Sequence, residues 1–247
     1  MQRLDIALVE RGLCDSREKA KRAVMAGQVT VNGQVARKAS DSVDAEDDLQ
    51  LVAGEKFVSR GGYKLEHALD TFGIDVSGQV TLDVGASTGG FTDCLLQRGA
   101  SRVYAVDVGQ GQLAWKLRQD RRVVVMEKTN ARELTASHFP PPFKPVDLAV
   151  VDCSFISLRK ILMPVVALIR LSGKVVALIK PQFEAGKAEA DRGAGVISDP
   201  AVHERVISEL REFVAKQPDL AWRGLTESPL LGPAGNKEFL VWIEKTA

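Results

Sequence analysis

The chain has 247 residues, of which 45% are hydrophobic and 26% charged, a composition typical of folded globular proteins and not of disordered or fibrous ones. Its formal net charge of +1 averages over a basic stretch from Arg11 to Lys38 and an acidic one from Asp41 to Asp48, so it does not exclude a nucleic-acid partner. The length predicts a small domain and a larger one. The sequence patterns place the small domain at 1–58, a linker at 59–63 whose glycines permit a hinge, and the larger domain at 64–247.

Cysteine usage and the apolar stretches limit the class of protein further. The three cysteines, Cys14, Cys94 and Cys153, have no Cys-x-x-Cys spacing, so neither a disulfide framework nor a zinc site is indicated. The first residues carry charges where a secretory signal needs an apolar core. The longest apolar stretch, Ile161 to Ile169, is about half of the ~20 residues that a membrane helix needs. We therefore expect a cytoplasmic protein with no membrane contact and no bound metal.

The first 58 residues alternate short helical and strand patterns. Apolar residues recur at helical spacing around Leu4 and again around Ala20, and Ser16 is placed to cap the second helix, which ends near Gly27. The following stretch, QVTVNGQVA, contains Asn32-Gly33 between alternating apolar residues, which is the strongest short hairpin signal. These patterns predict a small α+β domain.

The second helix, its end near Gly27 and the VNG hairpin follow one another along the chain. This order resembles the αL RNA-binding module of small-subunit ribosomal protein four. Ala39 departs from that pattern, since a proline is common there. A Lys- and Arg-rich helix beside a hairpin can follow a phosphate backbone and gain affinity from counterion release, although such a charge run can also be a plain solvated face. The resemblance implies that ribosomal RNA or ribosomal subunits contact Arg3, Arg17, Lys21, Arg22, Asn32 and Lys38.

From Val80 onward, apolar strand patterns alternate with helical ones. Strands separated by helix-length segments predict right-handed βαβ units and a doubly wound, Rossmann-like α/β sheet. The final strand follows a loop at 229–235 and is free to enter the sheet antiparallel. The predicted strands are VTLDVG, RVYAVDVG, VVVME, DLAVVD, GKVVALIK and EFLVWIE.

The stretch LDVGASTGGFT runs from a strand through glycines into a helix. Glycines let a backbone approach a ligand closely, yet the pattern is neither the dinucleotide G-x-G-x-x-G nor a P-loop, and a structural bend would need similar glycines. It resembles the first motif of class I S-adenosylmethionine methyltransferases, in which an acidic residue at the next strand end, here Asp107, accepts hydrogen bonds from ribose hydroxyls. The resemblance implies a cofactor site made of Asp83, Gly85, Ala86, Ser87, Thr88, Gly89, Gly90, Phe91, Asp107, Asn130 and Asp152.

Four further polar residues are expected at the same edge of the sheet. Asp152 and Lys180 end two predicted strands, and ligands of open α/β sheets bind outside the carboxyl ends of strands. Lys64 precedes the first strand and Glu238 opens the last. Taken alone, each of these residues is as well explained by a surface salt bridge.

Together, the motifs SRGGYKL, LDVGASTGGFT, VVDCSFISL, LIKPQFE and GNKEF resemble the TlyA-like family of FtsJ-type 2′-O-methyltransferases over nearly the whole chain. That resemblance implies a catalytic tetrad of Lys64, Asp152, Lys180 and Glu238, and methylation of cytidine ribose in 16S or 23S ribosomal RNA. A lysine amine has an ordinary pKa of about 10.4, so a basic Lys180 must first lose its proton. Lys64 is the neighbouring cation that would favour this, whereas Asp152 would mainly orient the amine and Glu238 would hold Lys64 or the ribose.

Other functions compete with this interpretation. Phe155 could stack on a flipped base in a base methyltransferase, and Cys153 could act as the nucleophile of a cytosine carbon-5 enzyme, but neither explains the two lysines. A ribosome-associated RNA-binding factor without activity is a further alternative. Some TlyA-like proteins are labelled hemolysins, yet no sustained apolar segment supports membrane lysis. Residues 184–196 are expected to form either a lid or a plain surface loop.

Overall fold

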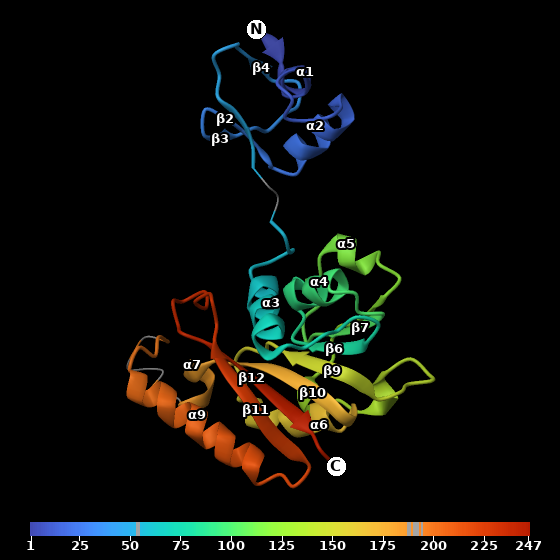
Figure 1. Ribbon diagram of the computed structural model, residues 1–247, viewed down its shortest axis with the longest axis vertical. Helices are drawn as coiled ribbons and strands as arrows, with labels where there is room; N and C mark the ends of the chain where they lie inside the picture. Colours follow the sequence, from blue (N-terminus) through green and yellow to red (C-terminus); the bar gives the residue numbers. More distant parts are fainter. Residues whose placement is uncertain (53–54, 187–188, 190–192, 194) are drawn as a thin grey trace. The chain divides into compact units, whose positions relative to one another are not determined.

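A computed structural model of the chain describes residues 1–247 except 53–54, 187–188, 190–192 and 194 (Figure 1). The described residues form two compact units, Met1–Lys56 and Phe57–Ala247. We refer to them as the N-terminal unit and, because it contains the four residues of the expected catalytic tetrad, the catalytic unit.

The N-terminal unit packs two helices against two small antiparallel sheets. One sheet pairs β1 with β4, and the other has the order β3-β2-β5. Its core consists of apolar side chains from both helices and from β2, β4 and β5. The elements are β1 (Gln2–Arg3), α1 (Leu4–Glu10), α2 (Arg17–Met25), β2 (Val29–Val31), β3 (Gln34–Val35), β4 (Ser42–Val43) and β5 (Leu49–Leu51).

Two local predictions in this unit are confirmed. The Ser16 side chain accepts a hydrogen bond from the backbone N–H of Lys19 and caps α2. Asn32 and Gly33 both have positive φ and join β2 to β3, as a two-residue hairpin turn with the twist of its flanking strands requires.

The catalytic unit is built on a seven-stranded sheet of order β11-β12-β10-β9-β6-β7-β8. Its central strands are parallel, while β12 runs antiparallel to both β10 and β11. This confirms the α/β class and the antiparallel entry of the last strand, but β11 was not predicted. The strands are β6 (Val80–Val84), β7 (Arg102–Val106), β8 (Val123–Met126), β9 (Val146–Val151), β10 (Ile169–Ile179), β11 (Leu220–Glu227) and β12 (Phe239–Lys245).

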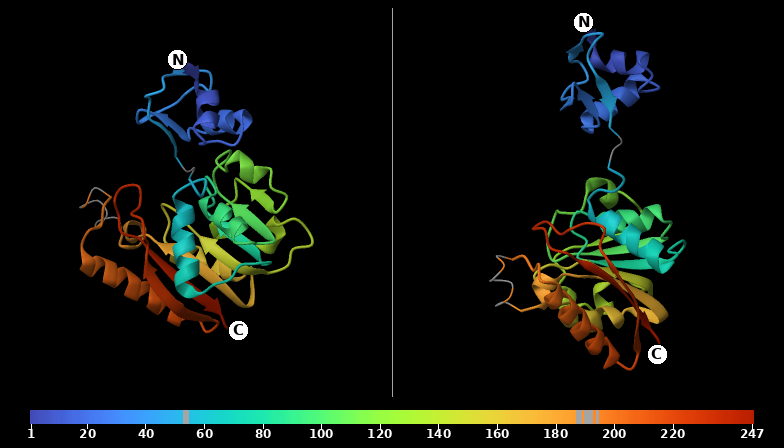
Figure 2. Two further views of the ribbon diagram at one scale, coloured as in Figure 1. Left: turned by 45° about the horizontal axis from the view of Figure 1, so that its top comes forward. Right: turned by 60° about the vertical axis from the view of Figure 1, so that its left-hand side comes forward.

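Helices cover both faces of this sheet (Figures 1 and 2). Alternate residues of β9 point to opposite sides, so Leu148 belongs to the core under α3 and α4, and Ala149 to the core over α6 and α9. The strand ends are thereby left to form the site. The helices are α3 (Gly61–Phe72), α4 (Gly90–Gln97), α5 (Trp115–Arg118), α6 (Leu162–Val166), α7 (Pro181–Glu184) and α9 (Pro200–Ala215), with short 3-10 turns η1 (Ala131–Glu133), η2 (Ala136–His138) and η3 (Leu158–Lys160).

The segment expected to be a linker is part of the catalytic unit. Phe57 is 1% exposed and packs in the core beneath α3 and α4. Gly61 and Gly62 form the first turn of α3, and a side chain on Gly62 would overlap the Phe57 ring. These glycines therefore serve close packing, and the division between the units falls between Lys56 and Phe57.

Candidate active site

The glycine turn between β6 and α4 brings three chain segments together. Gly85 has φ of +86°, and a Cβ there would collide with the backbone carbonyl of Asp152 at the end of β9. A Cβ on Gly90 would overlap the Ser59 hydroxyl just before α3. Because these glycines have no side chain, the turn can contact both Asp152 and Ser59 closely.

Asp83 lies beneath this turn and does not line either of the two cavities described below. It is fully buried on β6, and its Oδ2 accepts a hydrogen bond of 2.6 Å from the Thr92 hydroxyl. Its Oδ1 has no hydrogen-bond partner among the described residues. Burial raises the pKa of Asp83 to about 7, against the opposing effect of the Thr92 hydrogen bond. The carboxyl group therefore underlies the turn without reaching its surface.

The carboxylate of Asp107 lines the first cavity, which has a volume of about 580 Å³. It accepts hydrogen bonds from the backbone N–H groups of Ser87 (2.8 Å) and Gly109 (2.6 Å), which hold it rigidly at the end of β7. Asn130 lines the same cavity, where its side-chain oxygen caps η1 by accepting from Arg132 N–H at 3.1 Å. Asp107, which is expected to bind the ribose, and Asn130, which is also in the predicted cofactor set, therefore share one cavity.

A second cavity of about 320 Å³ adjoins the first, since Gly85, Ser87, Asp152 and Ser154 line both. Most residues of the glycine turn reach this second cavity, but Gly89 instead packs on Leu113 and Leu117. From the predicted cofactor set, the residues that line it are Gly85, Ala86, Ser87, Thr88, Gly90, Phe91 and Asp152.

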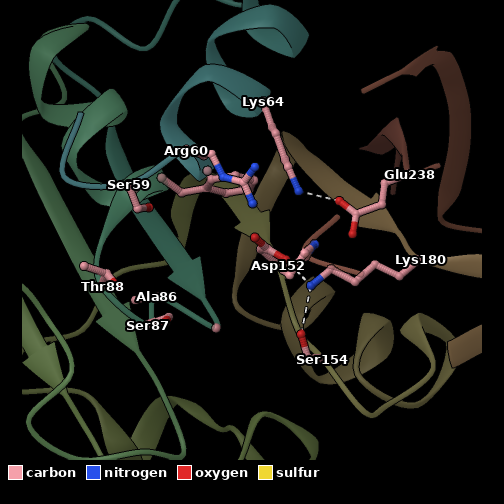
Figure 3. A pocket seen from close by; sticks show the side chains of 15 residues that line it. Ser59, Arg60, Lys64, Ala86, Ser87, Thr88, Asp152, Ser154, Lys180 and Glu238 are labelled. Carbon is pink, nitrogen blue, oxygen red and sulfur yellow. Dashed lines mark hydrogen bonds and ion pairs between the residues drawn. The ribbon is translucent and has the colours of Figure 1, made fainter. Parts of the chain in front are cut away.

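All four residues of the expected tetrad line the second cavity (Figure 3). Lys64 from α3 forms an ion pair with Glu238, and both side chains are buried. Lys180, directly after β10, has its Nζ 2.6 Å from Asp152 Oδ1. The cavity is therefore lined by two lysine–carboxylate pairs that come from four separate segments of the chain.

Sequence reasoning missed Ser154 as a member of this site. Its hydroxyl accepts a hydrogen bond of 2.9 Å from Lys180 Nζ, beside the ion pair with Asp152 (Figure 3). Its position three residues beyond the end of the parallel strand β9 is the signal that could have indicated it. Asp152 and Ser154 together fix the direction of the Lys180 amine.

The residues on which two competing chemistries depend, Cys153 and Phe155, lie at this edge of the sheet. Burial raises the pKa of the Cys153 thiol to about 12, which disfavours the thiolate that a carbon-5 nucleophile requires. Phe155 is 90% exposed, and its ring lies 5.1 Å from that of Phe183. Among the described residues, no group of three or more His, Cys, Asp or Glu side chains could hold a metal ion.

In the N-terminal unit, several predicted RNA contacts have structural partners. Arg3 and Arg17 both bind the buried carboxylate of Asp5 with distances of 3.0 Å, and their own side chains are about half exposed. Asn32 holds the acidic loop through hydrogen bonds of 2.8 Å with Asp47 and Asp48. Lys21 pairs with Glu18 on α2, whereas Arg22 and Lys38 are exposed.

Comparisons with known proteins agree with this geometry. The family model described as "FtsJ-like methyltransferase" matches residues 57–245, and the one described as "S4 domain" matches residues 2–49. The chain belongs to the FtsJ-like methyltransferase family. This FtsJ-like methyltransferase is 44% identical to the 16S/23S rRNA (cytidine-2′-O)-methyltransferase TlyA of Mycobacterium tuberculosis, over 98% of this chain and 89% of that protein.

Two further relatives of this FtsJ-like methyltransferase carry the hemolysin name. Hemolysin A of Brachyspira hyodysenteriae is 41% identical, over 96% of this chain and 98% of that protein. A solved structure described as a hemolysin from Streptococcus thermophilus has a TM-score of 0.74 and 44% identity, over 99% of this chain and 88% of that one. Within the described residues, no helix is long and apolar enough to cross a membrane.

Proposed function

We propose that the chain transfers a methyl group from S-adenosylmethionine to the ribose 2′-hydroxyl of a cytidine in 16S or 23S ribosomal RNA. Two lysine–carboxylate contacts support the proposal most directly, Lys64 with Glu238 and Lys180 with Asp152. Both contacts line the second cavity, which adjoins the first cavity. Two lysines in one cavity suit proton transfer from a hydroxyl and not recognition of a base.

The first cavity, which Asp107 and Asn130 line, fits the cofactor. Its volume of about 580 Å³ lies within the range of roughly 300–1,000 Å³ for small-molecule sites. Asp107 presents a fixed carboxylate for the ribose hydroxyls, and Asn130 presents an amide for the adenine, while Val108 and Ile156 provide apolar walls. When bound, S-adenosylmethionine supplies a methyl group on a sulfonium, which is a good leaving group.

The chain's own residues then prepare the hydroxyl. Asp152 and Ser154 hold the Lys180 amine toward the cavity. After this amine has released its own proton to solvent, its lone pair positions the 2′-hydroxyl and receives the hydroxyl proton. Lys64, fixed by Glu238, stabilises the negative charge that develops on the hydroxyl oxygen. The two pairs need little reorganisation during the reaction because both lysines are already in place.

The substrate class rests on the relatives and on the N-terminal unit. The matched S4 domain brings exposed cations, including Arg22 and Lys38, that suit a phosphate backbone. Relatives from Mycobacterium tuberculosis and Campylobacter jejuni are named rRNA (cytidine-2′-O)-methyltransferases. Ribosomal RNA, free or in ribosomal subunits, is therefore the proposed partner, and the reaction is proposed to occur in the cytoplasm.

The decisive test compares Lys180→Ala with a matched control on the same strand, Lys174→Ala. We expect Lys180→Ala to lower the single-turnover methylation rate by ~10²- to 10⁴-fold, as loss of a proton acceptor does. Binding of S-adenosylhomocysteine, measured by calorimetry, should stay unchanged in both variants. A Lys180→Ala enzyme that keeps most of its rate contradicts the proposed role.

A second measurement identifies the product. The RNA methylated by the wild-type protein is cleaved with alkali, because a methylated 2′-hydroxyl blocks cleavage beside its nucleotide whereas a methylated base does not. A protected position at a cytidine is the expected result. Methylated nucleosides without alkali protection would instead identify a base methyltransferase.

A further inference from the structure

The cavity that contains the tetrad has an additional cation. Among the described residues that line it, the positive side chains are Arg60, Lys64 and Lys180, and the negative ones are Asp152 and Glu238. Both lysines are paired with carboxylates. Arg60 is exposed, and its guanidinium forms no hydrogen bond or ion pair with the part of the chain that the structure describes. The cavity therefore has one positive charge in excess, and Arg60 carries it.

The backbone under Arg60 is fixed, although its side chain is free. Arg60 immediately precedes α3, and its carbonyl accepts a hydrogen bond of 3.2 Å from Tyr63 N–H. The preceding carbonyl, of Ser59, accepts 3.1 Å from Gly62 N–H. Figure 3 shows the Arg60 side chain reaching into the same cavity as Lys64 and Asp152. A rigid base with a free charged end suits a ligand, because little backbone entropy remains to be lost on binding.

The chemistry of a ribose substrate identifies that ligand. In RNA the phosphodiester is attached to the 3′ oxygen, on the carbon next to the one that carries the 2′-hydroxyl. A chain that brings a 2′-hydroxyl to Lys180 thus brings a phosphate into the same region. Arginine presents a planar fork of N–H donors that matches two phosphate oxygens. Neither lysine is free for this contact, since each already has a carboxylate partner.

We infer that Arg60 binds the phosphodiester of the target nucleotide and thereby sets the position of its 2′-hydroxyl. The inference rests on the proposed function and adds a substrate-binding residue outside the lysine–carboxylate tetrad. Contacts to phosphate fix register without reading sequence, so Arg60 determines how accurately the ribose is aligned and not which base is chosen.

The test measures methylation of unmodified ribosomal subunits by Arg60→Ala and Arg60→Lys, with Arg121→Ala as a matched control. Arg121 is an exposed arginine that does not line the cavity. We expect Arg60→Ala to lower kcat/KM by ~10- to 100-fold, the range for a hydrogen bond to a charged group. Arg60→Lys keeps the charge but loses the fork, so its activity should lie between the two. Arg121→Ala should match the wild type.

Two further readouts separate a phosphate contact from other roles. The slope of log affinity for subunits against log salt should become shallower by about 0.7–0.9 in Arg60→Ala, as expected for one lost phosphate contact. The affinity for S-adenosylhomocysteine should not change. A weakened affinity would assign Arg60 to the carboxylate of the cofactor, and an unchanged salt slope or an unchanged kcat/KM would equally overturn the inference. Failure of the wild-type protein to methylate any ribose is a separate result, which contradicts the proposed function itself.

Discussion

Among the described residues, each unit contains one aspartate with no exposed surface, and these two carboxyl groups differ in the direction of their pKa shifts. In the N-terminal unit, the hydrogen bond from Arg3, helped by Arg17, lowers the pKa of Asp5 to about 2. In the catalytic unit, burial raises the pKa of Asp83 to about 7, because the hydroxyl of Thr92 compensates only part of the lost hydration. Burial alone therefore does not decide the charge, and the partner does.

Two individual ion pairs show a related contrast. Lys21 and Glu18 of the N-terminal unit pair at the surface, where water screens them. In the catalytic unit, Lys64 and Glu238 are both buried, and each is the main compensation for the other's lost hydration. The Lys21–Glu18 pair is consequently weak and exchangeable, while the Lys64–Glu238 pair keeps its charges in a fixed arrangement.

The largest expected effect comes from breaking the buried pair. Glu238→Ala leaves Lys64 buried without its carboxylate, so we expect the free energy of unfolding of the catalytic unit to fall by about 3–5 kcal/mol. Denaturation followed by tryptophan fluorescence measures this unit specifically, because Trp115, Trp222 and Trp242 all belong to it.

Glu244→Ala is the matched control for this substitution. Glu244 lies on the same strand and pairs with the half-exposed Arg223 at 2.7 Å, a contact worth about 0–1 kcal/mol. Equal losses in the two variants would contradict the distinction between buried and exposed pairs. The double variant Lys64→Met, Glu238→Leu should recover much of the stability but none of the methylation.

The sequence was sufficient for most of the sheet and for the tetrad, and the exceptions have physical causes. Apolar runs predict β6 and β9, and the strand-end rule brings Asp152 and Lys180 to one edge. The apolar pattern did not predict β11, LAWRGLTE, which is an edge strand. A register shift between Trp222 and Gly224 breaks the alternation of apolar and polar residues in this strand.

Side-chain partners were the second gap. Arg3 and Arg17 were predicted only as RNA contacts, since nothing in the sequence shows that Asp5 is buried between them. Gly61 and Gly62 were expected to form a hinge, since a sequence does not show that the Phe57 ring packs against the helix start. These gaps share one cause, which is that tertiary contacts give residues partners that their local sequence pattern does not show.

The second prediction concerns the pH dependence of stability. The pKa of Asp83 is about 7 in the folded protein against 3.8 when exposed, so between these values the folded state binds the additional proton. Its contribution is fully favourable below pH 3.8 and is lost as the pH rises toward 7, by about 4 kcal/mol at ~1.4 kcal/mol per pKa unit. Asp83→Asn should flatten this part of the stability profile of the catalytic unit.

Asp5 provides the opposite sign within the same chain. Its lowered pKa means that its contribution is present above pH 3.8 and is lost as the pH falls toward 2. The expected loss is only about 1 kcal/mol, because Arg3 and Arg17 are half exposed and water screens their attraction. Hydrogen exchange resolved by unit separates the two effects. Slopes of the same sign in both units would contradict the contrast between the two aspartates.

The smallest expected effect distinguishes two neighbouring cations on α2. Lys21 is already paired with Glu18 at 3.0 Å, whereas Arg22 is exposed and has no ion-pair partner among the described residues.

Binding of each variant to ribosomal subunits is measured at several salt concentrations. Arg22→Ala should make the slope of log affinity against log salt shallower by about 0.7–0.9, and Lys21→Ala by less, since Glu18 competes with RNA for that charge. Both variants should keep their stability within ~0.5 kcal/mol. Equal slopes would mean that RNA displaces the surface pair freely, and that the local pairing of charges in the N-terminal unit places no limit on which cations bind phosphate.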